Sequence, residues 1–402
     1  FFEGNTYPKG TWVIPMAQEF GELARQLIDI QEYPDLRESP DGPLEQPYDA
    51  AGWTLPYQME VEVVAAMSPL PESISSSLIP VKGIALEENT DTSIDLSKAD
   101  FIGGAGFDTN EVAAGIVPLP GTLKGSGGTL VIDPKENNSF RIIGDAMNQN
   151  LAIGFNPKQQ TYAIGNASRL QIQKWVKDYA VNAKLTSTKP KTKVHSRIAV
   201  YDPWTASMDM GWTRWLLDNF NIPYVIIRNA DINNGSLNDR FDVILMASEK
   251  PGIIENGFQK GMAPPQYAGG LKGMGVRNID SFVSAGGTLV CLNKSTSFAI
   301  NELHLPIENN VQELTKSQFF TGGSILEVTN NNQHPIMAGM PEKSGVFVFG
   351  SPVFKTLDGF DGEILSKYQE KGSPLLSGYL VGEEYLNDKA AAVDVRYKNG
   401  HV

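Results

Sequence analysis

The stretch "RIAVYDPWTASMDMGWTRWLLDNFNIPYVIIRN", residues 197–229, decides the fold. It begins with a short apolar run, continues at helical spacing and ends in a second apolar run. Two further apolar runs follow, "FDVILMA" at 241–247 and "GTLVCLN" at 287–293, and the helical segment "RNIDSFVSAG" at 277–286 precedes the last of them. Strands that alternate with helices and are apolar on both faces indicate a parallel sheet covered by helices on both sides.

Residues 195–402 are therefore predicted to form an open α/β domain of the flavodoxin-like kind, the fold of class I glutamine amidotransferases. In such sheets, ligands bind outside the carboxyl ends of the strands, where the strand order reverses. The residues that follow the predicted strands are acidic, polar or aromatic, and an acidic rim suits polar or cationic ligands. The candidate substrate-binding residues are Asp202, Trp204, Asp209, Glu249 and Asn293.

The helix predicted over 207–220 has a strong beginning and one apolar face. Ser207 is a suitable N-cap, and Asp209 in the first turn suits the helix dipole. Arg214 lies roughly opposite the apolar face and has Asp218 four residues later, the spacing of a surface ion pair. The apolar face is predicted to fill the core, and its residues are Met208, Trp212, Trp215, Leu216 and Phe220.

The first part of the chain is predicted to be a linking segment, residues 1–67. Within it, "TWVIPMA" at 11–17 is predicted to be a short strand, and "EFGELARQLIDI" at 19–30 has the apolar stripe of a helix. The segment "GWTLPYQMEVEVVAA" at 52–66 ends in alternating apolar residues, which favour a strand.

Residues 68–190 are predicted to form a small α/β domain. The segment at 128–150 has the pattern of a strand, a polar turn and a helix, and 167–183 that of a second helix. The segment "KLTSTKPKTKVHS" at 184–196 is polar and locally basic in an acidic chain. This composition predicts a solvated linker at a domain boundary.

The charge and the histidines exclude several classes of function. The formal net charge is −13, which argues against a surface for nucleic acid or anionic membrane because the Lys/Arg excess is missing. No run of about 18 apolar residues is present, so no membrane span is expected. None of the four histidines belongs to an "HxxE" or "HExxH" pattern, so neither a metal site nor zinc catalysis by this chain alone is expected.

Cys291 is the only cysteine, and its position decides between a nucleophile and a core residue. A catalytic thiol of the amidotransferase kind stands on a sharp elbow between strand and helix, with a histidine and an acid near it. Cys291 lies inside the strand "GTLVCLN" instead. Matched to that elbow, the segment places Asn293 at the nucleophile position, and a side-chain amide cannot serve there. We therefore expect Cys291 to be a buried apolar residue.

Several segments together resemble the long region downstream of the catalytic domain in large bacterial zinc carboxypeptidase-like proteins of the carboxypeptidase A class. The resemblance extends over essentially the whole chain. It implies a secreted metallopeptidase domain, a linking region and a class I glutamine amidotransferase-like domain that has lost its nucleophile. The segments are "TYPKGTWVIPMAQ", "YPDLR", "PYDAAGWTLPYQM", "DMGWTRWLLDNF", "GSPVF" and "LLSGYL".

The resemblance implies a parent that hydrolyses peptides or cell-wall-type peptides from the carboxyl end, outside the cytoplasm. Its zinc would be held upstream by an "HxxE" pair and a distant histidine, none of which matches a position here. The first hypothesis is thus an auxiliary, non-catalytic region whose partner is its own upstream catalytic domain, with substrate binding as a further role. The alternatives are a glycan- or peptide-binding module and an amidotransferase-like hydrolase. The strand and Asn-Gly turn at the end of the chain favour a domain truncated at its C-terminus.

Overall fold

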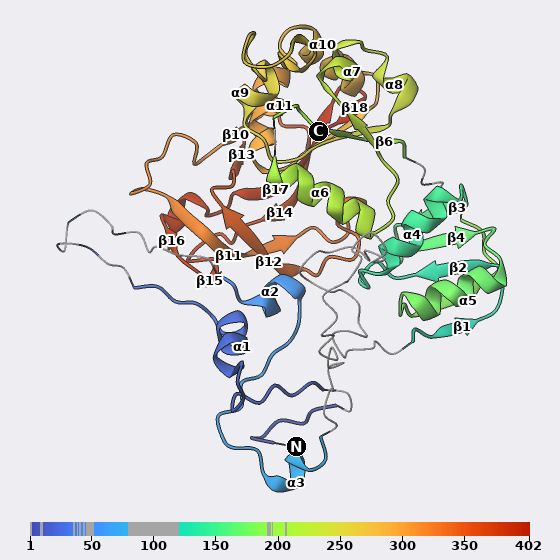
Figure 1. Cartoon of the computed structure of the whole chain (residues 1–402), viewed down its shortest axis with the longest axis vertical. Helices are drawn as coiled ribbons and strands as arrows, with labels where there is room; N and C mark the ends of the chain where they lie inside the picture. Colours follow the sequence, from blue (N-terminus) through green and yellow to red (C-terminus); the bar gives the residue numbers. More distant parts are fainter. Residues whose placement is uncertain are drawn as a thin grey trace, which may run out of the picture.

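A computed structural model of the chain contains two sheets (Figure 1). A five-stranded sheet lies between residues 123 and 186, and a thirteen-stranded sheet lies between 198 and 401. Figure 1 shows the smaller sheet, with its two helices, beside the larger one. The structure describes residues 2–8, 11–34, 37, 39, 42, 45, 52–78, 120–190, 194, 196–205 and 207–402.

The described residues before 79 form three short helices and irregular backbone. The predicted helix at 19–30 is confirmed as α1 (Gly21–Ile28). The two strands predicted at 11–17 and at the end of 52–66 are wrong, because these residues pair with no strand in the described part of the chain. Alternating apolar residues cannot form a strand without a partner for their backbone groups. The other two helices are α2 (Leu55–Met59) and α3 (Glu72–Ser75).

The five-stranded sheet has the order β1-β5-β2-β4-β3 and is covered by α4 (Ser139–Asn148) and α5 (Arg169–Asp178). Leu130, Ile142 and Trp175 lie in its core, each at most 2% exposed. The predicted strand, turn and two helices are confirmed, whereas the hairpin β3–β4 and the strand at the start of the predicted linker were not expected. The strands are β1 (Leu123–Gly125), β2 (Thr129–Ile132), β3 (Ala152–Asn156), β4 (Thr161–Gly165) and β5 (Ala183–Thr186).

The larger sheet contains five parallel strands in the order β7-β6-β8-β9-β18. Numbered along the chain this is 2-1-3-4-5, the flavodoxin-like order, with its reversal between β6 and β8. The predicted fold class is therefore correct. The strands are β6 (Ile198–Tyr201), β7 (Val225–Ile227), β8 (Val243–Met246), β9 (Thr288–Cys291) and β18 (Gly400–His401). The helices are α6 (Met208–Asn219), α7 (Asn229–Asn233), α8 (Leu237–Arg240), α9 (Pro251–Asn256), α10 (Met274–Ser284) and α11 (Thr296–Leu303).

Antiparallel strands extend this sheet beyond β18. The predicted hairpin at the end of the chain forms between β17 and β18, and β18 pairs in parallel with β9. The antiparallel part has its own small core around Leu326, Val348 and Tyr368. Its strands are β10 (Ile307–Asn309), β11 (Phe320–Asn330), β12 (Lys343–Phe349), β13 (Phe354–Thr356), β14 (Gly362–Lys367), β15 (Leu375–Ser377), β16 (Leu380–Val381) and β17 (Ala390–Tyr397).

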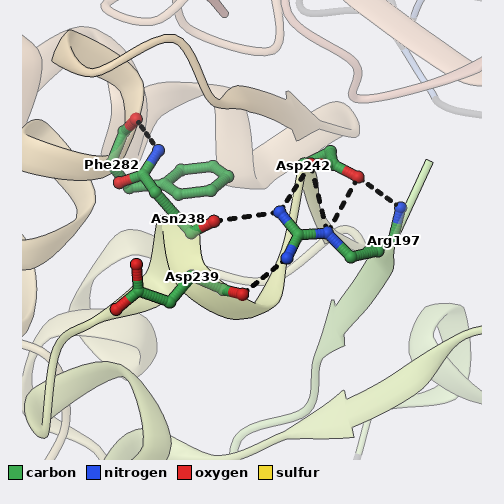
Figure 2. Close-up of polar contacts among 5 residues, drawn as sticks. All are labelled: Arg197, Asn238, Asp239, Asp242 and Phe282. Carbon is green, nitrogen blue, oxygen red and sulfur yellow. Dashed lines mark hydrogen bonds and ion pairs between the residues drawn. The ribbon is translucent and has the colours of Figure 1, made fainter. Parts of the chain in front are cut away.

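Hydrogen bonds of Arg197 connect the amino-terminal end of β6 to α8 and to the turn before β8 (Figure 2). Its guanidinium donates to the Asp242 carboxylate at 2.7 Å and to the main-chain oxygens of Asn238 and Asp239. Asn238 in turn donates its side-chain amide to the Phe282 carbonyl of α10, 2.9 Å away. This network fixes the edge of the sheet opposite the carboxyl ends of the strands.

The apolar face of α6 is not buried, which corrects the sequence prediction. Ser207 does cap the helix by accepting from the Met210 N–H. The exposed fractions are 65% for Trp212 and 42% for Trp215, however, and Met210 packs on the sheet instead. The helix is apolar on more than one face, so spacing alone did not identify the side that packs. The expected ion pair is also replaced, because Arg214 and Asp218 both bond the hydroxyl of Tyr224.

In the described ranges, the helices are all too short or too polar to cross a membrane.

Candidate functional site

The rim at the strand-order reversal is built around an ion pair between Asp202 and Arg228. Asp202 follows β6, Arg228 follows β7, and their charged atoms are 2.9 Å apart. The side chains are 14% and 29% exposed, so solvent screens the pair only partly. Arg228 also donates to the main-chain oxygens of Asp202 and Pro203, at 3.0 and 3.3 Å. The guanidinium therefore holds the loop after β6 in place.

Trp204 lies against the same arginine. The guanidinium carbon of Arg228 is 4.2 Å from the centre of the indole, a cation–π distance. Tyr267, from the short helix η1 (Pro265–Tyr267) between α9 and α10, also contacts Trp204, with ring centres 4.4 Å apart. The indole at the rim is thus in contact with two side chains of the protein itself.

Tyr201 lies behind this rim and is almost fully buried. Its hydroxyl donates to Asn229 Oδ1 at 2.7 Å, and Asn229 Nδ2 donates to the Gly269 carbonyl. Burial, followed by the carboxylates of Glu249 and Asp202, raises the pKa of Tyr201 well above its usual value. Tyr201 therefore acts as a neutral hydrogen-bond donor here.

The connection from β9 to α11 is a sharp elbow with Asn293 at its tip. Asn293 has φ of +51°, in the left-handed region, and the 3-10 turn η2 (Asn293–Ser295) leads directly into the helix. Buried Ser295 fixes the turn by hydrogen bonds to the carbonyls of Met246 and Leu292, at 3.0 and 2.8 Å. Asn293 Oδ1 is enclosed and has no hydrogen-bond partner in the described part of the chain. Asn293 therefore stands at a sharp turn between strand and helix, as the sequence predicts.

Cys291 is two residues before that tip, within β9. It is partly buried and packs against the main core of the parallel sheet. Burial raises the pKa of its thiol to about 12, and a contact with Ser295 opposes this only in part. The thiolate that nucleophilic chemistry requires is therefore scarce at neutral pH.

The structure brings some of the predicted site residues together and leaves others apart. Asp202 and Trp204 share Arg228, and Glu249 acts on Tyr201. Asp209 is exposed on the first turn of α6, and no described hydrogen bond or ion pair links it or Asn293 to the others. Sequence reasoning missed Arg228 and Tyr267. Arg228 could have been found, because it directly follows the strand in "YVIIRN", whereas Tyr267 comes from a loop with no pattern.

A metal centre is not formed by the described residues: no three His, Cys, Asp or Glu side chains among them are placed to hold one ion.

Comparisons with known proteins give structural likeness only. No protein-family model matches the sequence, and no curated protein is similar to it. One similar solved structure is PurLQS from Thermotoga maritima, 14% identical over 51% of this chain and 84% of that one, with a TM-score of 0.32. A ThuA-like protein from Bacteroides uniformis is 10% identical over 48% and 79%, with a TM-score of 0.28. A glutamine amidotransferase from Thermotoga maritima is 8% identical over 46% and 73%, with a TM-score of 0.27. Likeness at this level says nothing about what this chain binds or catalyses.

Proposed function

We propose that this chain is a non-catalytic auxiliary region of a zinc carboxypeptidase-like peptidase, with an amidotransferase-like domain that no longer performs catalysis. The observation that carries the proposal is the elbow at Asn293. The backbone has the strand–turn–helix geometry and the positive φ of a nucleophile elbow, but it presents a carboxamide.

The carboxamide cannot replace a thiol or hydroxyl at this position. Its nitrogen lone pair is delocalised into the carbonyl, so it does not attack an acyl carbon, and no base can activate it by removing a readily lost proton. The one thiol of the chain, Cys291, is partly buried within β9 and its pKa is raised. The domain thus retains the geometry of the fold without its nucleophile.

The contacts among the side chains of the rim also support a non-catalytic role. Arg228 lies between Asp202 and Trp204, and Tyr267 covers the indole further. A substrate that entered at the strand-order reversal would first have to displace these contacts. A rim whose side chains are already paired with one another suits a domain that supports or positions a catalytic partner. It suits a domain that turns over substrate less well.

The partner is proposed from the sequence resemblance. In the proteins that this sequence resembles, a zinc peptidase domain precedes a region of this kind, and that domain would supply the metal and the hydrolysis. The proposal therefore assigns peptide cleavage and zinc to the upstream domain, and assigns support and substrate positioning outside the cytoplasm to this chain.

The test compares this chain with the full product of its gene. The purified chain, supplied with zinc, is expected to release no carboxyl-terminal residue from hippuryl-phenylalanine or hippuryl-lysine. The full product, sequenced from its own start, is expected to carry an upstream "HxxE" and to cleave one of them. A full product without such a domain would refute the auxiliary role, as would peptide cleavage by the chain alone.

A further inference from the structure

Two tryptophans on α6 are exposed although they stand in a folded domain. Trp212 and Trp215 contact each other edge to face, with ring centres 5.8 Å apart and planes at 82°. Met208 and Leu216 beside them are also exposed. Large aromatic surfaces left in water on a helix that packs on the sheet through Met210 indicate a contact with something outside the described chain.

A concavity of about 890 Å³ adjoins this helix at its carboxyl end. It lies between α4 of the smaller domain and the segment that joins α6 to β7. Clefts between domains are common ligand sites. Its lining is half polar and half apolar, and consists of Asp145, Asn148, Asp218, Asn221, Ile222, Pro223, Tyr224, Val225 and Ile226.

Three hydrogen bonds hold the Asp145 carboxylate in place as an acceptor in this cleft. Its Oδ2 accepts the indole N–H of Trp175 at 2.7 Å and the Tyr179 hydroxyl at 2.8 Å. Its Oδ1 accepts the side-chain amide of Asn221 at 3.0 Å. A carboxylate offers about four lone-pair positions, so one on Oδ1 remains for a donor in the cleft.

Asp218 offers a second acceptor from the opposite wall. Its Oδ1 accepts the Tyr224 hydroxyl at 2.9 Å, and within the described residues its Oδ2 accepts no hydrogen bond. Asn148, which also lines the cleft, donates its amide to the carbonyls of Gly144 and Asn221, and its side-chain oxygen accepts no hydrogen bond from the described residues. The cleft is therefore richer in open acceptors than in open donors.

The charges around the cleft nearly balance. Arg214 donates to the Tyr224 hydroxyl that also bonds Asp218, and Arg141 donates to Asn219 beside the Asp145 network. Two guanidinium groups thus accompany the two carboxylates of the cleft, and the nearby ion pair of Lys174 with Asp178 adds one charge of each sign. This balance disfavours a strongly cationic peptide and suits an uncharged ligand that carries many hydroxyl donors.

The tryptophans and the cleft form one continuous surface. Trp215 and Asp218 are three residues apart on α6, a spacing that makes side chains neighbours along a helix. Trp212 precedes Trp215 by the same step. A ligand several residues long can therefore contact the indoles with one part and the cleft with the next.

We propose that this surface, Trp212, Trp215 and the cleft at Asp145 and Asp218, binds an uncharged oligosaccharide. The C–H groups of a pyranose ring carry a slight positive charge and pack on the negative face of an indole. Sugar hydroxyls donate to the open carboxylate oxygens in strong, charge-assisted hydrogen bonds, and to the carboxamide oxygen in an ordinary neutral one. The site is separate from the rim around Trp204 and does not depend on the proposed role beside a peptidase.

The probes are cellotetraose and N-acetylchitotetraose, titrated into the full chain while its tryptophan indole N–H resonances are followed by NMR. Trp175 reports on the cleft because its N–H bonds Asp145, and Trp212 and Trp215 report on the helix. Shifts at these three indoles with either sugar, and none at Trp204, are expected. Binding should weaken at least about tenfold in Trp215→Ala and measurably in Asp218→Asn.

Trp12→Ala is the matched control, since Trp12 is as exposed as Trp212 but lies in the amino-terminal segment. Its affinity should equal that of the unchanged chain. Trp215 and Asp218 are both exposed, so their variants should keep the fold, which the unchanged indole resonance of Trp175 would verify. The proposal is overturned if neither sugar shifts an indole at about 10 mM. Unchanged affinity in both variants, or binding of a lysine-rich peptide in place of both sugars, also overturns it.

Discussion

The guanidinium of Arg228 lies 4.2 Å from the centre of the Trp204 indole and reaches the Asp202 carboxylate at 2.9 Å. One side chain from the end of β7 thus occupies both groups that the sequence offers as ligand contacts after β6. The side chains at the strand-order reversal are thus paired with one another.

Replacing Arg228 by Met should remove the contacts of the guanidinium with Asp202 and Trp204 while keeping an apolar side chain of similar length. Asp202 would be left largely buried without its partner, so the free energy of unfolding should fall by about 2 kcal/mol. Urea unfolding followed by tryptophan fluorescence measures the change. Arg240→Met is the matched control, because Arg240 also lies over an aromatic ring and near an aspartate but is 41% exposed. In Arg240→Met the free energy of unfolding should fall by less than about 1 kcal/mol. Equal falls in the two variants would contradict the stabilising role assigned to Arg228.

The Cys291 thiol should be unreactive in the folded protein. Because its pKa is raised to about 12, very little thiolate exists at pH 8, and Ellman's reagent should label it only after denaturant is added. The raised pKa also predicts a direction for stability. The neutral Cys291 thiol makes its full contribution to the free energy of unfolding below the unfolded thiol pKa of about 8.5. This contribution is lost as pH rises toward 12. Rapid labelling of the native protein would contradict this picture.

Gly144 on α4 should tolerate no side chain, because it touches the backbone that follows α6. An added Cβ would lie 2.2 Å from the Phe220 carbonyl oxygen and 2.6 Å from the Asn221 carbonyl carbon. Gly144→Ala should move α4 away from the end of α6 and expose the Asp145 network, seen as faster hydrogen exchange at Asn221. Gly211→Ala is the control, with open space at its Cβ inside α6. It should stabilise the helix by about 0.5–1 kcal/mol.

Asp394 should hold the end of the chain through two histidines. His401 Nδ1 lies 2.9 Å from one of its oxygens and His334 Nε2 lies 3.6 Å from the other, while Asp394 is only 11% exposed. Asp394→Asn leaves an amide that cannot accept from both imidazoles, so β18 should exchange its amide hydrogens faster. Asp361→Asn, which removes the exposed partner of Arg396, should leave β18 unaffected. The idea fails if both variants exchange alike.

The parallel half of the large sheet was predictable because its strands are continuous apolar runs. Residues 198–201, 243–246 and 288–291 are apolar on both faces, and each is separated from the next by helical spacing or turns. Apart from the terminal hairpin of β17 and β18, the antiparallel half was missed. Its strands are short or irregular, and β11 alone pairs with four different partners across two register shifts, an arrangement that local patterns do not encode.

The location of the candidate site could be predicted from the sequence, but the contacts among its side chains could not. Asp202 and Asn293 follow strands, so their position at the rim follows from topology. The partners of Trp204 come from residues 24 and 63 positions further along the chain, and only the fold brings them together. The α6 tryptophans were assigned to the core because apolar residues usually pack there. Met210, outside that stripe, packs against Val200 and Ala247 instead.

The most direct test of the central claim is covalent labelling by an electrophilic glutamine analogue, 6-diazo-5-oxo-norleucine, read by intact mass together with ammonia release from glutamine. A catalytic elbow would form a stable thioether with its cysteine. We predict no added mass on the native chain and no ammonia above the buffer blank, since Asn293 stands at the elbow and the pKa of the partly buried Cys291 thiol is raised. Stoichiometric labelling of Cys291 in the folded protein, with glutamine hydrolysis, would contradict the claim.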